Sequence, residues 1–301
     1  MLRVEGVIPV LLTPFTEKHE LNEPALRRFV NRFIESGVDG LFCLGTNGEF
    51  FSLTMEEKIR IVEIVVDETR GRVPVYAGTG GIGTKDVAEL SERMEAAGAD
   101  ALSIITPYFL PLSQRELAEH YKSIASWTSL PIVLYNFPSR TGIHLEPETV
   151  AALSSVPNIV GVKDSSGNFD TILRYIQSTP PDFAVLSGSD NLLLWTLAAG
   201  GKGGVSGSAN VVPTLMTAIY TLWKRGELPA AKETQQLLRP LSDIYQRATL
   251  PSVFKEAVNL MGLNAGPCRP PIAPLDSGLR EQLRTLLRSY KELGYIKEEI
   301  Q

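Results

Sequence analysis

The sequence predicts a (β/α)8 barrel, that is a TIM barrel, with a C-terminal helical extension. Short β-branched segments alternate with longer amphipathic segments about eight times, and this alternation stops before the last quarter of the 301 residues. About eight strand–helix units in one chain of this length are typical of the α/β barrel class. A doubly wound open sheet shows the same alternation and is therefore the alternative.

The expected strands are short apolar stretches rich in β-branched residues and bounded by turn-forming residues. In chain order they are Val7–Leu12, Gly40–Leu44, Val73–Ala77, Ala101–Ile105, Ile132–Tyr135, Ile159–Lys163, Ala184–Leu186 and Gly204–Ser206.

The segments between the first strands have helical periodicity. In one of them Ile59, Val62, Val65 and Val66 recur at the spacing that places apolar side chains on one helix face. Glycines just after three of these segments mark helix ends. The expected helices in this part of the chain are Glu23–Ser36, Met55–Arg70, Asp86–Ala97 and Gln114–Trp127, with stops at Gly37, Gly71 and Gly98.

From Pro229 onward no further strand is expected. Helical patterns continue at Ala230–Ala248, Ser252–Met261 and Gly278–Leu293, with a proline-rich stretch between the last two. We therefore expect residues 1–226 to form the barrel that carries the active site. Residues 227–301 would form a helical extension packed on that barrel.

Composition excludes several classes of function. The formal net charge is −5, and no basic stretch is long enough to follow a nucleic-acid backbone. The two cysteines lack the spacing of a zinc site or a disulfide framework, and His19, His120 and His144 lack ligand spacing and are expected at surface or loop positions. The apolar N-terminal stretch is too short to span a membrane. A cytoplasmic globular protein with no metal is expected.

Lys163 is the most unusual residue of the predicted strands. It closes the apolar strand that begins at Ile159, and catalytic groups of barrels lie at such strand ends. Loss of water around an amine favours its neutral, nucleophilic form, which can make an imine with a ketone or aldehyde. Tyr135 ends the neighbouring strand and could supply the proton transfers. The alternative for Lys163 is an ion pair with Asp164. The alternative for Tyr135 is a core tyrosine that forms a hydrogen bond with the backbone.

Two further strand ends carry groups that suit an anion. The loop Gly45–Glu49 has two glycines around Thr46 and Asn47, so its amides could turn toward a carboxylate. Arg140 follows Pro138 on another loop, where its guanidinium could hold a second carboxylate. The alternative for the loop Gly45–Glu49 is an ordinary turn that caps a helix, and the alternative for Arg140 is a solvent-exposed arginine with no binding role. Taken together with Lys163 and Tyr135, these groups predict one site.

Three other classes of function are weaker hypotheses. Gly78–Gly83 matches GxGxxG between a strand and a helix, but a dinucleotide site needs an acid at the end of the next strand, and Asp100 begins that strand instead. A phosphosugar-binding barrel would bind phosphate with the loops at Gly188 and Gly207, after the last two strands. Lys202 could not help to bind it there, because this lysine precedes the last strand and is expected at the opposite end of the barrel. A non-catalytic binding protein is the third alternative.

The chain resembles the dihydrodipicolinate synthase/N-acetylneuraminate lyase family of Schiff-base pyruvate lyases. The resemblance runs from Gly6–Pro9 to Pro267–Leu275. It depends on three motifs in order, GTNGE at 45–49, YNFPSRTG at 135–142 and GVKDSSGN at 161–168. It implies a (β/α)8 barrel with a C-terminal helical extension that assembles as a homotetramer, a dimer of dimers.

The resemblance also implies a role for each site residue. Lys163 would form a covalent imine with pyruvate, so that no separate cofactor or metal is needed, and Tyr135 would transfer protons. Thr46 and Asn47 would offer amides to the pyruvate carboxylate, and the Thr46 hydroxyl would join the proton relay. The other positions that would line the pocket are Gly188 and Val205.

Two acceptors remain open within the family. Arg140 resembles the arginine with which dihydrodipicolinate synthases hold aspartate semialdehyde. Phe109 stands where the synthases carry a second tyrosine, Asn47 replaces their second threonine, and the segment Phe254–Ala257 looks more like bacterial 2-keto-3-deoxygluconate aldolases. We expect a synthase-like condensation of pyruvate with aspartate semialdehyde, with a sugar-acid aldolase as the alternative. Phe50 and Ile82 stand where lysine-inhibited synthases have polar contacts, so feedback inhibition by lysine is not expected.

Overall fold

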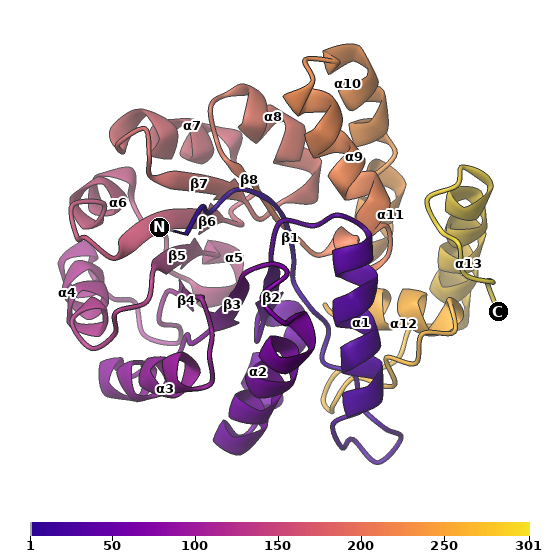
Figure 1. Ribbon diagram of the computed structural model, residues 1–301, viewed down its shortest axis with the longest axis horizontal. Coiled ribbons are helices and arrows are strands. Elements are labelled where there is room, and N and C mark those ends of the chain that lie inside the picture. The colour runs from indigo at the N-terminus through magenta and orange to yellow at the C-terminus, as the bar shows by residue number, and fades with distance from the viewer. Residues whose placement is uncertain (1) are drawn as a thin grey trace.

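The computed structural model describes residues 2–301 and contains a parallel β-barrel surrounded by helices (Figure 1). The barrel confirms the predicted fold class, and each strand overlaps the stretch expected for it. The strands are β1 (Gly6–Pro9), β2 (Leu41–Cys43), β3 (Val75–Gly78), β4 (Ala101–Ile105), β5 (Ile132–Asn136), β6 (Ile159–Asp164), β7 (Ala184–Ser187) and β8 (Gly203–Ser206).

The sheet closes on itself between its first two strands. Each strand pairs in parallel with its neighbours in the order β1-β8-β7-β6-β5-β4-β3-β2. A parallel bridge joins Val10 to Phe42 next to β1 and β2, and the amide of Leu11 donates to the carbonyl of Phe42 over 2.8 Å. Closure brings the carboxyl ends of all the strands to one rim of the barrel.

Alternation along the strands separates two apolar layers. Within each strand, every second side chain lies in the large core between the barrel and its helices; Val7, Leu41 and Leu134 are examples. The side chains between them, such as Ile8 and Phe42, form a smaller cluster inside the barrel. Successive residues of a strand point to opposite faces, so the position of a residue in this alternation decides whether its side chain enters the barrel.

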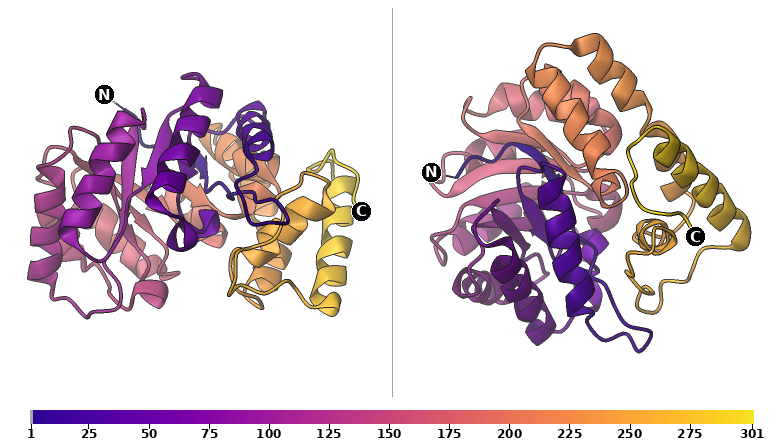
Figure 2. Two further views of the ribbon diagram at one scale, coloured as in Figure 1. Left: turned by 90° about the horizontal axis from the view of Figure 1, so that it is seen from below. Right: turned by 45° about the vertical axis from the view of Figure 1, so that its right-hand side comes forward.

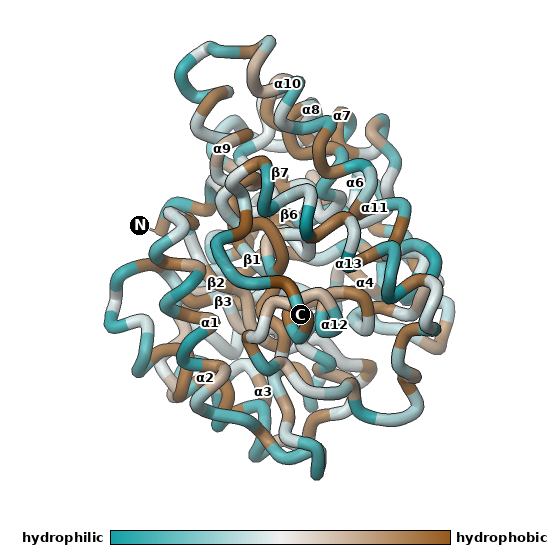
Figure 3. The backbone as a smooth tube through the Cα atoms, turned by 90° about the vertical axis from the view of Figure 1, so that its right-hand side faces the viewer, coloured by the Kyte–Doolittle hydropathy of each residue, from teal (hydrophilic) through white to brown (hydrophobic). Residues whose placement is uncertain are grey.

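Helices cover the outside of the barrel with their apolar faces, and hydrophobic and hydrophilic residues alternate along them (Figure 3). Capping boxes begin two of them, Thr54 with Glu57 and Ser113 with Glu116. The helices within residues 2–226 are α1 (Glu23–Glu35), α2 (Met55–Thr69), α3 (Thr84–Ala96), α4 (Gln114–Ala125), α5 (Pro138–Thr141), α6 (Pro147–Leu153), α7 (Phe169–Ser178), α8 (Leu193–Ala198) and α9 (Pro213–Lys224).

The C-terminal segment is helical, as expected, and lies beside the barrel (Figure 2). Its helices are α10 (Leu228–Gln236), α11 (Arg239–Tyr245), α12 (Ser252–Leu260) and α13 (Ser277–Glu292). None of the helices within residues 2–301 combines the length and the apolar character needed to cross a lipid bilayer.

Two expectations about individual elements are wrong. The single helix expected over Ala230–Ala248 is divided into α10 and α11, because Pro240 near the start of α11 has no N–H for a helix continuing from α10. His120, expected at a surface or loop position, is buried in α4, and its Nδ1 lies 2.9 Å from Thr84 Oγ1. Its Nε2 has no hydrogen-bond partner among the described residues.

Burial of His120 should make the protein less stable in acid. Burial lowers the pKa of His120 from 6.5 to about 4, so the unfolded chain binds a proton that the folded chain excludes. Stability from this residue is therefore full above pH 6.5 and is lost as the pH falls toward 4, by about 2 kcal/mol. Urea unfolding of wild type and His120→Gln across this range should show a shallower acid loss for the variant. Equal slopes would contradict the prediction.

Candidate active site

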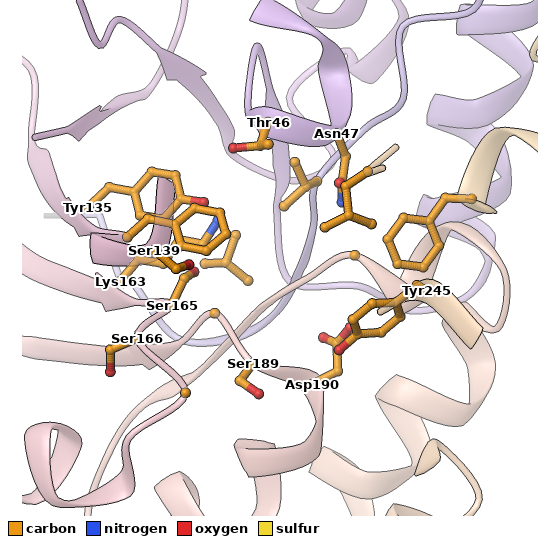
Figure 4. A pocket seen from close by; sticks show the side chains of 18 of the residues that line it. Thr46, Asn47, Tyr135, Ser139, Lys163, Ser165, Ser166, Ser189, Asp190 and Tyr245 are labelled. Atoms are coloured by element: carbon orange, nitrogen blue, oxygen red, sulfur yellow. The ribbon is translucent and has the colours of Figure 1, made fainter. Parts of the chain in front are cut away.

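A cavity of about 410 Å³ opens at the carboxyl-terminal rim of the barrel, between the strand ends and the C-terminal helices (Figure 4). Six of the seven predicted site residues line it: Thr46, Asn47, Tyr135, Lys163, Gly188 and Val205. The site therefore lies at the end of the barrel where parallel strands deliver functional side chains.

Lys163 and Tyr135 lie opposite each other on adjacent strands. The register pairs Tyr135 of β5 with Lys163 of β6, and both side chains are about 4% exposed. Lys163 Nζ lies 3.9 Å from the centre of the Tyr135 ring and 5.1 Å from that of Phe42. An amine in this position is desolvated and faces a π surface.

Lys163 does not pair with Asp164, which was the alternative interpretation of this lysine. Asp164 is the next residue of β6, so its side chain points to the outer face of the sheet. There it accepts hydrogen bonds from Asn136 Nδ2 over 2.7 Å and from Ser166 Oγ over 2.6 Å. Within residues 2–301 no carboxylate lies within 4.0 Å of Lys163 Nζ. Burial raises the pKa of Asp164, an effect that these hydrogen bonds oppose.

Thr46 and Asn47 lie in a single 3-10 turn, Thr46–Gly48, directly after β2. The amide of Gly48 donates to the carbonyl of Gly45, but the amides of Thr46 and Asn47 donate to no other described residue. Thr13, which follows β1 in the chain, donates its Oγ1 hydroxyl to the carbonyl of Gly48 over 2.7 Å and so connects the turn to that part of the barrel. Two free amides on one turn at the cavity can bind a carboxylate.

Glu49 ends this turn in the left-handed region, with φ of 55°. That conformation costs a residue with a side chain on the order of 1 kcal/mol, so the surroundings must hold it. The carboxylate of Glu49 is fully buried and lies 2.6 Å from Lys255 Nζ of α12. Sequence reasoning named both positions only as parts of motifs and did not identify this pair.

Gly188 and Val205 shape the floor of the cavity. A Cβ atom on Gly188 would lie 3.0 Å from Lys163 Cε and 2.0 Å from Ser165 Oγ. A larger residue at this position would therefore crowd both side chains. Val205, on β8, is buried in the cluster inside the barrel. Gly188 directly follows β7, and Val205 lies within β8.

Arg140 is the predicted site residue that the structure does not bring into the cavity lining. It belongs to the short helix α5, its side chain is exposed, and it makes no ion pair with a described residue. Ser139, its neighbour, does line the cavity. Arg140 therefore lies beside the site, in the short helix that follows β5.

Sequence reasoning missed the wall that the C-terminal segment contributes. Tyr245 of α11 packs on Phe254 of α12 with their ring centres 5.4 Å apart. Burial raises the pKa of Tyr245 to about 12. Asp190, after β7, is also buried at the cavity, where it accepts a hydrogen bond from the Ser208 amide over 2.8 Å. The residues from the C-terminal segment that line the cavity are Tyr245, Gln246, Leu250 and Phe254.

Two glycines of the GxGxxG sequence, Gly78 and Gly80, allow close packing at the strand ends. A Cβ atom on Gly78 would lie 2.3 Å from the carbonyl oxygen of Leu44, and one on Gly80 would lie 2.3 Å from Ile105 Cγ2. Lys202 lies just before β8, at the amino-terminal end of the barrel, as expected. Within residues 2–301 no cluster of three or more His, Cys, Asp or Glu residues is arranged to hold a metal ion.

The fold and this site define a class I aldolase-type lyase, an enzyme that works through an imine on a lysine. The sequence profile described as the Dihydrodipicolinate synthetase family matches residues 3–290, and the chain belongs to this family.

Relatives and solved structures agree with this assignment. The chain is 45% identical to the 4-hydroxy-tetrahydrodipicolinate synthase of Methanopyrus kandleri, with 98% of each chain covered. It is 38% identical to that of Bacillus subtilis, covering 94% of this chain and 98% of the relative. Dihydrodipicolinate synthase from Thermotoga maritima superposes with a TM-score of 0.94 at 34% identity, over 96% and 99% of the two chains.

A second similar structure was solved in complex with pyruvate. It is a prophage protein of E. coli K12 that belongs to the dihydrodipicolinic acid synthase family. Its TM-score is 0.92 at 36% identity, and the alignment covers 96% of this chain and 99% of that one.

Replacing Gly188 with alanine should disturb Lys163 directly. The added methyl group meets Ser165 and the lysine side chain, and such overpacking typically costs about 1–3 kcal/mol. We expect the free energy of unfolding of Gly188→Ala, measured in urea, to fall by that amount. Ser189→Ala is the matched control, since it alters a neighbouring residue of the same lining without adding volume. Equal stability of Gly188→Ala and wild type would contradict the close approach.

Proposed function

We propose that this protein condenses pyruvate with aspartate semialdehyde, as a 4-hydroxy-tetrahydrodipicolinate synthase of lysine biosynthesis. The observation that carries the proposal is the buried amine of Lys163, held 3.9 Å from the Tyr135 ring in a cavity at the barrel rim. The names of relatives that are 38–45% identical over nearly the whole chain support the same reaction.

The reaction begins when Lys163 Nζ attacks the C2 ketone of pyruvate. The resulting carbinolamine loses water to give the imine, whose positive charge draws electrons from the methyl carbon. Loss of a proton from that carbon gives an enamine, which forms the new carbon–carbon bond to the aldehyde carbon of the acceptor. Each step moves a proton, and Tyr135 with the Thr46 hydroxyl are the proposed carriers.

The pyruvate carboxylate has a proposed place opposite the amine. The free amides of Thr46 and Asn47 are available to bind it, and no described carboxylate is paired with Lys163. Gly188 leaves room for the imine, and Val205 contributes an apolar wall that disfavours water. Arg140, exposed on α5, is proposed to reach the far carboxylate of the acceptor from the cavity mouth.

The character of the lining favours a second candidate acceptor. Four serines and Gln246 line the cavity, and Arg140 does not line it. A polyhydroxylated aldehyde suits such a surface, so the second candidate function is a sugar-acid aldolase of the 2-keto-3-deoxygluconate type. The serines of the lining are Ser139, Ser165, Ser166 and Ser189.

We also propose that the protein acts as a homotetramer, a dimer of dimers, in the cytoplasm. Phe109 has φ of 81° and is 84% exposed, and Leu110 beside it is 54% exposed. A strained, exposed aromatic residue suits burial by a second copy of the chain. Cys43 and Cys268 are free thiols, which suits a reducing compartment. Residues 1–226 and 227–301 are the proposed barrel and extension.

Borohydride reduction in the presence of pyruvate should trap the imine on Lys163. The trapped protein should gain the mass of one reduced pyruvyl group, located on the peptide that contains Lys163. Lys163→Met should show no adduct, whereas Lys202→Met, changed at the opposite end of the barrel, should react like wild type. No adduct on wild type, or an adduct on another lysine, would contradict the mechanism.

Replacing Arg140 with alanine distinguishes the two acceptors. With aspartate semialdehyde we expect kcat/KM to fall by about 100-fold, because loss of a bidentate ion pair to a carboxylate costs about 2–3 kcal/mol. Trapping of pyruvate on Lys163 should stay within about twofold of wild type, since Arg140 lies outside the cavity lining. Condensation should be measured beside cleavage of 2-keto-3-deoxygluconate. Activity with the sugar acid alone, unaffected by Arg140→Ala, would favour the aldolase and contradict the synthase.

A further inference from the structure

The ion pair between Glu49 and Lys255 joins the turn that holds Thr46 and Asn47 to the C-terminal segment. Glu49 is 0% exposed and Lys255 is 2% exposed, and their charged atoms lie 2.6 Å apart. Most of the other ion pairs within residues 2–301 have a partner that is at least one-third exposed. A charge pair that has lost its water needs close partners on every side.

Each member of the pair is held by further contacts. The second oxygen of Glu49 accepts a hydrogen bond from the backbone amide of Arg269 over 2.9 Å. Lys255 Nζ donates to the carbonyl of Pro267 over 2.8 Å and lies 4.1 Å from the centre of the Phe15 ring. The carboxylate thus comes from the barrel, and its partners come from the C-terminal segment.

The C-terminal segment also binds the residues that follow Glu49 in the chain. The guanidinium of Arg269 donates to the carbonyl of Ser52 over 2.9 Å and to Glu57 Oε2, at the start of α2, over 2.7 Å. Arg269 also packs 4.3 Å from the centre of the Phe15 ring. The path of the chain from Gly48 to Glu57 is therefore fixed by residues far along the sequence.

We propose that Glu49 and Lys255 are positioning residues that set the orientation of the Thr46 and Asn47 amides for binding of the pyruvate carboxylate. This inference rests on the proposed function, because it concerns the pyruvate end of the same site. Neither side chain lines the cavity, so the pair acts through the backbone of the turn.

The backbone connection is short. The amide of Glu49 donates to the carbonyl of Thr46 over 3.1 Å, so the two residues close one hydrogen-bonded turn. The left-handed conformation of Glu49 determines the direction in which the turn leaves the cavity. If the carboxylate loses its anchor, Glu49 can relax toward a more favourable conformation, and the amides two and three residues earlier must move with it.

A role in stability alone is the competing explanation, and the choice of variants separates the two. Removing one member leaves a buried unpaired charge, which destabilises strongly, whereas replacing both members with apolar residues of similar size is often neutral. Lys255→Met should therefore lose stability and pyruvate binding together. The double variant Glu49→Met/Lys255→Met should recover stability but should not recover the orientation of the amides.

The experiment measures the melting temperature and the pyruvate concentration that gives half-maximal borohydride trapping on Lys163. We expect the double variant to need at least about 10-fold more pyruvate than wild type, while trapping at saturating pyruvate reaches the wild-type level. The KM for the acceptor, measured at saturating pyruvate, should stay within about twofold. Such a split between two substrates would not follow from a general loss of stability.

The matched control is the pair Glu256–Arg280. Glu256 follows Lys255 on α12 and bonds Arg280 of α13 over 2.5 Å, without contacting the turn. Glu256→Met/Arg280→Met should keep the wild-type pyruvate dependence. If Glu49→Met/Lys255→Met does not fold, Glu49→Gln serves instead, because it keeps the shape and the acceptor for Arg269 but removes the charge. It should need about threefold more pyruvate.

Wild-type pyruvate dependence in a folded double variant, or in Glu49→Gln where that variant replaces it, would overturn the positioning role. A rise of equal size in the Glu256→Met/Arg280→Met control would overturn it as well. No trapping in wild type would instead contradict the proposed function, and the role of the pair with it. The two failures are therefore distinguishable.

Discussion

The parallel register between β5 and β6 is the constraint on which the rest of the site depends. It places Tyr135 opposite Lys163, and the alternation of side chains then sends both into the barrel. A shift of one residue would exchange Lys163 with Asp164, and the amine would enter the outer core in place of the carboxylate. The hydrogen bonds between β5 and β6 therefore also decide which titratable group reaches the cavity.

The alternation also separates the two charges of the Lys163–Asp164 sequence. Asp164 satisfies its oxygens on the outer face with Asn136 and Ser166, so it does not neutralise the lysine next to it. Lys163 faces aromatic rings on the inner face, above the apolar cluster of the barrel interior. An amine without a carboxylate partner is available for bond formation to a ketone, whereas one in an ion pair would first have to break it.

Local sequence patterns predicted the barrel strands, Lys163 and Tyr135, because strand periodicity and strand ends are properties of neighbouring residues. They did not predict what distant segments do to each other. The division between α10 and α11 depends on Pro240, which lies within an otherwise helical pattern. The burial of His120 depends on α3 packing beside its helix, and the wall formed by Tyr245 and Phe254 depends on the chain returning to the barrel rim.

The C-terminal segment reaches the site from two directions, so it shapes the cavity as well as covering the barrel. Lys255 and Arg269 hold the loop after β2 through Glu49. Gln235 of α10 is buried, and its Nε2 donates to the backbone carbonyl of Asp190 in the loop after β7 over 2.9 Å, while its Oε1 accepts from the amide of Leu194 over 3.0 Å. The loops at a barrel rim join each strand to the next helix and are more mobile than the elements that they connect. Buried polar contacts from outside the barrel fix the far side of these loops, so the geometry of the cavity is set jointly by both parts of the chain.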